Sequence, residues 1–122
     1  MTQDQSSNDN SPDEPMILVH TTCADRDEAH RLAGLVVDNR LAACASVGQP
    51  ITSIYPWDGK IEHDTETPLT LKTTRARFEA LREFLNERHS YDVPELLAVE
   101  VVDGNADYIQ WVRDWVMRRE EA

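Results

Sequence analysis

The chain has 122 residues, of which 23 are acidic and 12 are basic, giving a formal net charge of −11. This length suits one domain with its own core rather than two. The negative charge argues against a partner made of nucleic acid or anionic lipid, since both need a positively charged protein surface. No apolar run approaches the roughly 18 residues of a membrane span, and the N-terminus lacks the pattern of a signal peptide, so we expect a cytoplasmic protein.

Residues 1–15 are expected to be a disordered acidic tail. They contain four acidic residues, no basic residue and no large apolar residue after Met1. Such a segment cannot bury enough apolar surface to offset the entropy lost on ordering. We therefore expect residues 16–122 to form the single folded domain.

A buried strand and a helix are expected first. The run "MILVHTT" from Met16 is apolar and β-branched, as is typical of a buried strand. Asp25 and Glu28 have the spacing of a capping box at a helix N-terminus. The helix is expected to continue to about Asn39, because apolar residues recur at helical spacing. These residues are Ala29, Leu32, Ala33, Val36 and Val37.

A long hairpin is expected next. The dipeptide Asp58-Gly59 is a strong signal for a two-residue turn, and it lies between two segments of strand-forming residues. Trp57, beside this turn, would be exposed in a monomer, which suggests that a partner subunit covers it. Three prolines cannot donate to a strand ladder, so we expect them at edges or bulges. They are Pro50, Pro56 and Pro68.

A second helix, another strand and a third helix complete the chain. Residues 75–89 carry a helical apolar stripe, and Val93-Pro94 prevents that helix from continuing. The run "ELLAVEVV", residues 95–102, is expected to be a buried strand, and residues 108–116 repeat apolar side chains at helical spacing. The order β-α-β-β-α-β-α predicts an α+β fold of the ferredoxin-like split βαβ type, an antiparallel sheet with helices on one face.

The two cysteines, Cys23 and Cys44, are expected to be free thiols, because two cysteines make no disulfide framework in a reducing cytosol. Cys44 lies among small apolar residues in "LAACASV", which is typical of a small buried side chain. Cys23 ends the first strand just before a helix N-terminus, which favours a thiolate. Two interpretations of Cys23 follow, a metal ligand or a free thiol at the surface.

His89 is the histidine best placed for a functional role. It ends the predicted second helix, where a protonated imidazole is stabilised and can cap carbonyl groups. That capping role is the structural alternative to a functional one. The four histidines share no zinc-type spacing. They are His20, His30, His63 and His89.

The residues after His89 are expected to form a polar pocket. Tyr91, Asp92 and Glu95 lie within one turn and the start of the next strand. A glutamate that opens a buried strand needs a partner, and Lys72 is a lone cation at the end of a strand. A Glu95–Lys72 ion pair is therefore the structural alternative to a binding site.

Five segments together resemble the CutA divalent-cation-tolerance family. In chain order they are "RLAACASV" (40–47), "TSIYPWDGKIEHDTE" (52–66), "LKTT" (71–74), "HSYDVPELLAV" (89–99) and "NADYIQWV" (105–112). The match runs from about Val19 to Trp115. The resemblance implies a ferredoxin-like protomer in a homotrimer similar to the trimeric PII signalling proteins. It also implies a cytoplasmic, non-catalytic role in tolerance to copper and other divalent metal ions.

The resemblance also implies candidate binding residues. Copper ligands proposed in the family are a cysteine at the end of the first strand and a His-His pair that closes the second helix. Here Thr21 and Arg88-His89 occupy those positions, so His89 remains, and Cys23 can replace the cysteine if the strand is still extended there. The residues that match the family's cleft between subunits are Trp57, Lys72, His89, Tyr91 and Glu95.

Four functional hypotheses follow. The leading one is a trimeric, non-catalytic protein with no obligatory cofactor, which binds divalent cations such as copper, or a small effector, in the clefts between its subunits. The second is a PII-like effector sensor in which metal binding is incidental. The third is an enzyme that uses His89 with Glu95 as acid and base. The fourth is a scaffold for another protein, which predicts an exposed apolar patch.

Overall fold

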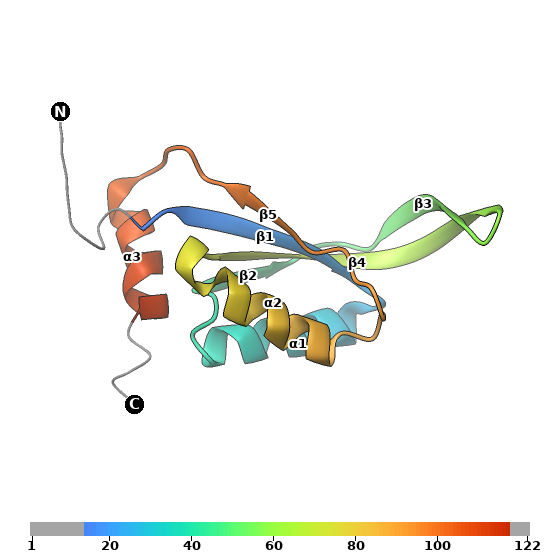
Figure 1. Cartoon of the computed structure of the whole chain (residues 1–122), viewed down its shortest axis with the longest axis horizontal. Coiled ribbons are helices and arrows are strands. Elements are labelled where there is room, and N and C mark those ends of the chain that lie inside the picture. Colours follow the sequence, from blue (N-terminus) through green and yellow to red (C-terminus); the bar gives the residue numbers. More distant parts are fainter. Residues whose placement is uncertain (1–13, 118–122) are drawn as a thin grey trace.

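The computed structural model describes residues 14–117 and contains a sheet, three α-helices and a protruding hairpin (Figure 1). The predicted order of elements is confirmed, except that the expected second strand is divided into β2 and β3. The elements are β1 (Met16–Cys23), α1 (Arg26–Asp38), β2 (Cys44–Val47), β3 (Ile51–Trp57), β4 (Lys60–Thr74), a 3₁₀ turn (Arg75–Arg77), α2 (Phe78–Arg88), β5 (Leu97–Glu100) and α3 (Ala106–Met117).

The strands form an antiparallel sheet in the order β2-β4-β1-β5, and β3 pairs with the first half of β4, residues 60–66. In the register of the sheet Leu18 lies opposite both Lys72 of β4 and Val99 of β5. This is the strand order of a split βαβ fold, in which the two outer strands flank a central antiparallel pair. The predicted fold class is therefore confirmed.

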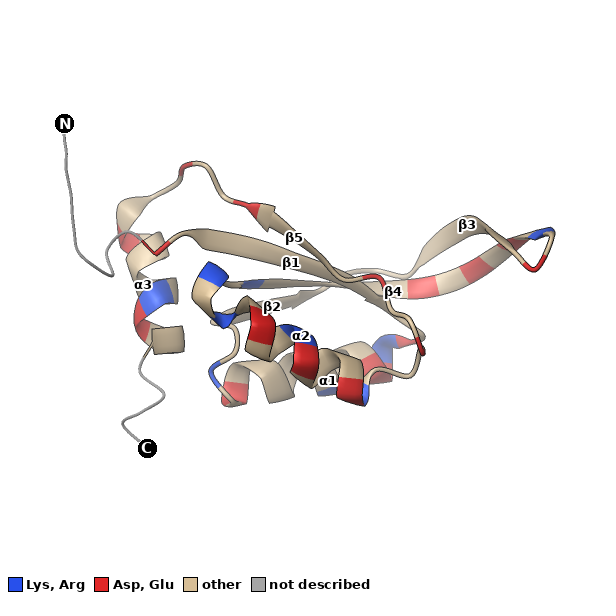
Figure 2. Cartoon of the chain, viewed as in Figure 1, with Lys and Arg blue, Asp and Glu red and all other residues tan. Residues whose placement is uncertain are grey.

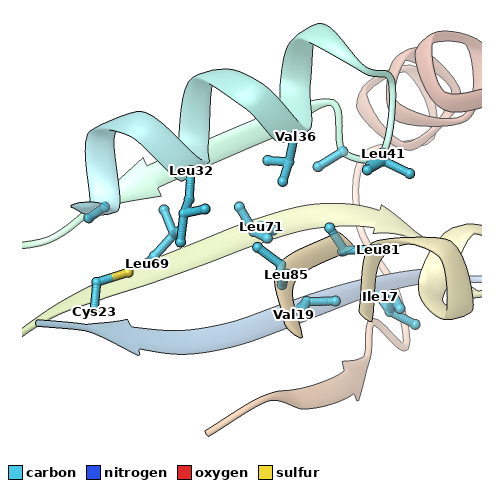
Figure 3. Close-up of a cluster of buried hydrophobic side chains, with 12 residues drawn as sticks. Ile17, Val19, Cys23, Leu32, Val36, Leu41, Leu69, Leu71, Leu81 and Leu85 are labelled. Atoms are coloured by element: carbon cyan, nitrogen blue, oxygen red, sulfur yellow. The ribbon is translucent and has the colours of Figure 1, made fainter. Parts of the chain in front are cut away.

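The main core lies between the sheet and the pair α1 and α2 (Figure 3). Ile17 and Val19 of β1 point into it, since alternate residues of a strand share a face. Met16 and Leu18 belong to the opposite face, where α3 packs through Val112. The two predicted helices thus cover one face of the sheet, and the added third helix contacts the other face near one end.

The hairpin of β3 and β4 turns at the predicted position. Asp58 and Gly59 have φ angles of 53° and 78°, as the two central residues of a type I′ turn require. Before the hairpin, Gly48 donates its N–H to the carbonyl of Pro68 at 2.9 Å. A Cβ on Gly48 would lie 2.8 Å from Cγ of Pro68, so glycine permits the close approach at which β2 ends.

Several boundaries differ from the sequence predictions, among them the start of the second helix, where residues 75–77 form a 3₁₀ turn before α2. The predicted buried strand 95–102 is only the four residues of β5, which lies at the edge of the sheet, and all four are exposed. Glu14 and Pro15, which the sequence prediction assigned to the tail 1–15, contact the folded chain: the side chain of Glu14 accepts from the N–H of Ala76 at 2.6 Å, and the carbonyl of Pro15 accepts from the N–H of Arg75. The remainder of that tail lies outside the described residues.

None of the helices between residues 14 and 117 is both long enough and apolar enough to cross a membrane.

Candidate functional site

Three side chains with metal-ligand chemistry meet where β1, α1 and α2 come together. Cys23 ends β1, Glu28 lies in the first turn of α1, and His89 follows the last residue of α2. One ligand atom from each lies within 4.8 Å of the other two. We call these three residues the Cys-Glu-His cluster.

Glu28 holds the cluster together through the start of α1. Asp25 caps the helix by accepting from the N–H of Glu28 at 2.9 Å, as the capping-box pattern predicts. The Glu28 carboxylate then turns away from solvent. It accepts from the N–H of Ala24 at 2.9 Å and from the N–H and hydroxyl of Ser90 at 2.7 and 3.0 Å.

These contacts explain the ionisation of Glu28. Burial raises the pKa of the carboxyl, but the hydrogen bonds from Ala24 and Ser90 lower it, and the lowering prevails. The pKa of Glu28 therefore lies below its ordinary value of 4.5. The cluster holds a carboxylate rather than a carboxylic acid at neutral pH.

His89 has both ring nitrogens in use. Nε2 lies 2.8 Å from the carbonyl of Thr22, which can only accept, so Nε2 carries the proton. Nδ1 is then the acceptor, and it receives the backbone N–H of Tyr91 at 3.1 Å. The side chain is fully buried. The predicted capping of helix carbonyls by the His89 ring is therefore wrong, since its partners are Thr22 of β1 and Tyr91.

Cys23 is a buried thiol. Burial, followed by the charges of Glu28 and Asp25, raises its pKa to about 12. The prediction of a free thiol at the surface is wrong, because β1 remains extended through Cys23 and turns the side chain onto the same face as Thr21, beneath the helices. The same extension confirms the condition on which Cys23 could replace the family's cysteine.

An acidic groove lies beside the cluster, between the hairpin and the segment 89–95. Its volume is about 890 Å³. Every charged residue that lines it is acidic, and Figure 2 shows red bands along β4 in the hairpin. Aromatic rings of Tyr55, Trp57 and Tyr91 form other parts of the wall. The acidic residues are Glu62, Asp64, Glu66, Asp92 and Glu95.

The predicted cleft residues are only partly together. Trp57, Tyr91 and Glu95 line the groove, and Trp57 is 68% exposed, as expected for a single chain. His89 lies behind the wall, with its ring 4.9 Å from that of Tyr91. Lys72 is absent from the lining.

The expected Glu95–Lys72 pair does not form. Glu95 lies 3.8 Å from Nε2 of His20, and Lys72 donates to the sulfur of Cys44 at 3.7 Å. The prediction failed because Lys72 lies in the middle of the sheet, opposite Cys44 of β2, whereas Glu95 precedes β5 at the other edge. Glu95 contacts His20 rather than His89, so the acid and base pair of the enzyme hypothesis is not assembled either.

Sequence reasoning missed Glu28, Glu66 and Ser90 as parts of the site. The hydroxyl of Tyr91 donates to Glu66 at 2.9 Å and so joins the segment 89–95 to the hairpin. The capping-box pattern identified Glu28 only as a helix-start residue. No local pattern signals the contacts with Ser90 and Glu66, since they join residues 62 and 25 positions apart.

Comparisons with known proteins agree on one family. A family model described as "CutA1 divalent ion tolerance protein" matches residues 17–115. The "Divalent-cation tolerance protein CutA" of Escherichia coli is 39% identical over 112 residues, covering 92% of this chain and 96% of that protein. "Protein CutA, chloroplastic" of Arabidopsis thaliana is 37% identical over 100 residues, which are 82% of this chain. The chain spans about half the length of its plant and mammalian relatives, 55% in the Arabidopsis protein.

The solved structures give the same result. The crystal structure of CutA1 from Oryza sativa superposes with a TM-score of 0.83 at 36% identity, covering 86% of this chain and 96% of that one. Sequence and structure therefore match over nearly all of the described residues. The chain belongs to the CutA1 family of divalent ion tolerance proteins.

Proposed function

We propose that the protein serves tolerance to divalent metal ions as a non-catalytic binding protein. The names of its relatives denote tolerance to divalent cations and no reaction. The single observation that carries the binding role is the Cys-Glu-His cluster, in which a thiol, a carboxylate and an imidazole lie within 4.8 Å of one another. A cytoplasmic location remains a prediction, because the Arabidopsis and rice relatives are named as chloroplastic.

The donor set fits a divalent ion of the later transition metals. Sulfur and nitrogen ligands favour copper, zinc or cobalt, whereas magnesium and calcium prefer oxygen alone. Metal–ligand bonds of about 2.0–2.3 Å place neighbouring ligand atoms of a tetrahedral site roughly 3.5 Å apart. Nδ1 of His89 and Oε2 of Glu28 are 3.8 Å apart, so a small contraction of the cluster would suffice.

Binding would require the Cys23 thiol to lose its proton, since the thiolate is the metal ligand. Because burial and nearby carboxylates raise the pKa of Cys23 to about 12, the ion itself must drive this deprotonation. Affinity should therefore increase with pH. In this role the ion is cargo or signal.

The test is a titration of Co²⁺ into a solution of the protein under oxygen-free conditions. The absorption spectrum of the solution is recorded after each addition. We expect about one ion per chain with micromolar or tighter affinity, and a sulfur-to-cobalt charge-transfer band, because Cys23 supplies the thiolate. Cys23→Ser should lose the band and most of the affinity. Cys44→Ser is the matched control and should keep both, since Cys44 lies outside the cluster.

Weak and equal binding by all three proteins would contradict specific metal binding at the cluster. The residual binding would then come from the acidic surface charge alone. The second hypothesis, a PII-like effector sensor, would then lead. The acidic groove supports it, since its carboxylates and aromatic rings would suit a small cation. The basic and aromatic cleft expected around Lys72 is not present within the single described chain.

We also propose that the protein acts as a homotrimer. The sheet face that lacks α1 and α2 exposes Leu97 and Val99 of β5, and the hairpin exposes Ile54, Trp57 and Ile61. Apolar side chains of this size, gathered on one edge and one hairpin, are typical of a surface that another chain covers. Three copies of the chain that bury one another's hairpins would cover these apolar side chains. The scaffold hypothesis would need a different protein to cover them.

A further inference from the structure

Two groups compete for the lone pair on Nδ1 of His89: the backbone N–H of Tyr91 and a metal ion bound by the cluster. In the described structure Nδ1 accepts the backbone N–H of Tyr91 at 3.1 Å. Nε2 cannot take over this role, because it carries the proton donated to Thr22. A metal ion that binds His89 through Nδ1, the nitrogen facing Glu28, must therefore displace the N–H of Tyr91.

Tyr91 joins the cluster to the groove. Its N–H binds His89, and its hydroxyl donates to Glu66 of the hairpin at 2.9 Å. Its neighbour Ser90 is bound to Glu28 through both N–H and hydroxyl. The following residues, Asp92, Val93 and Glu95, line the groove with Tyr91. The segment 89–95 is thus one wall of the groove and is fastened to two members of the Cys-Glu-His cluster.

We propose that capture of a divalent cation by the cluster releases Tyr91 and its neighbours from their present position and so remodels the groove. This coupling rests on the proposed metal binding and names its consequence. Two states differ in defined contacts. In the closed state, which is that of the described structure, His89 accepts a hydrogen bond from Tyr91, and Tyr91 donates one to Glu66. In the metal-bound state, Nδ1 of His89 binds the ion instead.

Coupling of this kind is reciprocal. An interaction that stabilises only the closed state weakens metal binding, because the ion must first break it. The bond from the Tyr91 hydroxyl to Glu66 is such an interaction, and it involves no metal ligand. Removing this hydrogen bond should therefore strengthen metal binding. The affinity of a preformed site for metal would not change when the bond is removed.

The experiment compares the affinity for Co²⁺ of the full chain with that of Tyr91→Phe. Loss of one hydrogen bond from the closed state should tighten binding roughly threefold to tenfold. Tyr108→Phe is the matched control: its ring stacks on that of Trp111 in α3, with 5.7 Å between the ring centroids, outside both the cluster and the groove. Its affinity should equal that of the unmodified protein.

Hydrogen exchange followed by mass spectrometry provides a second readout that does not depend on the variants. Saturation with Zn²⁺ should accelerate exchange of the amides in residues 89–95, since Tyr91 and Ser90 lose their acceptors, while those of β1 stay protected. Equal Co²⁺ affinity in all three proteins with unchanged exchange would overturn the coupling and leave metal binding intact. No Co²⁺ binding by the unmodified chain would overturn both.

Discussion

At the scale of single residues, Glu28 makes more of the contacts that hold the site together than any pattern in the sequence indicates. Its carboxylate is nearly inaccessible to solvent, and it satisfies the N–H groups of Ala24 and Ser90 together with the hydroxyl of Ser90. A buried acceptor that serves three donors from two separate segments fixes the relative position of those segments. Glu28 thereby sets the distance between β1 and the segment after α2.

Replacement of Glu28 by glutamine should destabilise the protein at neutral pH by about 2 kcal/mol. The side chain keeps its shape, but its new NH₂ group faces N–H groups that it cannot satisfy. Urea unfolding at pH 7 measures the difference. Glu83→Gln, on the exposed side of α2, is the control and should change the free energy of unfolding by a few tenths of a kcal/mol at most.

The effect of Glu28→Gln should also depend on pH. Because the folded-state pKa of Glu28 lies below 4.5, the carboxylate contributes stability above the unfolded pKa and loses it as the pH falls through the folded one. The unfolding free energies of the two proteins should therefore converge below about pH 4.5. A difference that stays constant down to pH 3 would show that ionisation of Glu28 contributes nothing to stability.

At the scale of elements, the hairpin is the part of the molecule most directly specified by its local sequence. The two positive φ angles at Asp58 and Gly59 fit the right-handed twist of the paired strands. The chain leaves β2 at Gly48, where Pro68 allows no side chain. The hairpin can therefore project from the sheet while β4 remains continuous through both pairings.

Two glycine-to-alanine substitutions should have opposite effects on stability. Gly59→Ala places a Cβ at a φ of 78° and should destabilise by about 1 kcal/mol. Gly34→Ala lies inside α1, where an added Cβ meets no atom within 4 Å, and should stabilise by about 0.5–1 kcal/mol through helix propensity. Chemical unfolding at one protein concentration measures both, and a neutral Gly59→Ala would argue against the type I′ turn.

At the scale of the whole molecule, the two faces of the sheet are covered unevenly. Helices α1 and α2 bury one face, and α3 protects only one end of the other (Figure 1). Leu97 and Val99 remain 55% and 56% exposed on β5, which is also an unpaired edge. Another copy of the chain could both pair with this edge and cover the apolar side chains.

Val99→Asp should dissociate the proposed trimer, because a carboxylate would enter an apolar contact without a partner. Sedimentation velocity at micromolar concentration should show a trimer for the unmodified chain and a smaller species for this variant. Ala80→Asp, an equivalent change on the exposed side of α2, should remain trimeric. A trimeric Val99→Asp would exclude β5 from the interface, and a monomeric unmodified chain would contradict the assembly itself.

Local sequence rules predicted the elements well and the contacts between them poorly. The capping residue Asp25, the turn at Asp58-Gly59 and the helical stripes of α1 and α2 each depend on neighbours within a few positions, and the structure confirms all of them. The exposure of β5 was mispredicted, since "LAVE" has the apolar composition of a buried strand. Its burial depends on what packs against it, which composition cannot reveal.

By itself the sequence determined the order of the elements, the place of the hairpin turn, the negative charge and the family resemblance, because periodicity, turn chemistry and motifs are local or additive. Only the tertiary structure placed Cys23, Glu28 and His89 together, separated Lys72 from Glu95, and joined Tyr91 to Glu66. Those contacts follow from strand register and from helix packing on the sheet. Both are decided by the burial of the whole core, so they are invisible in any short stretch of the chain.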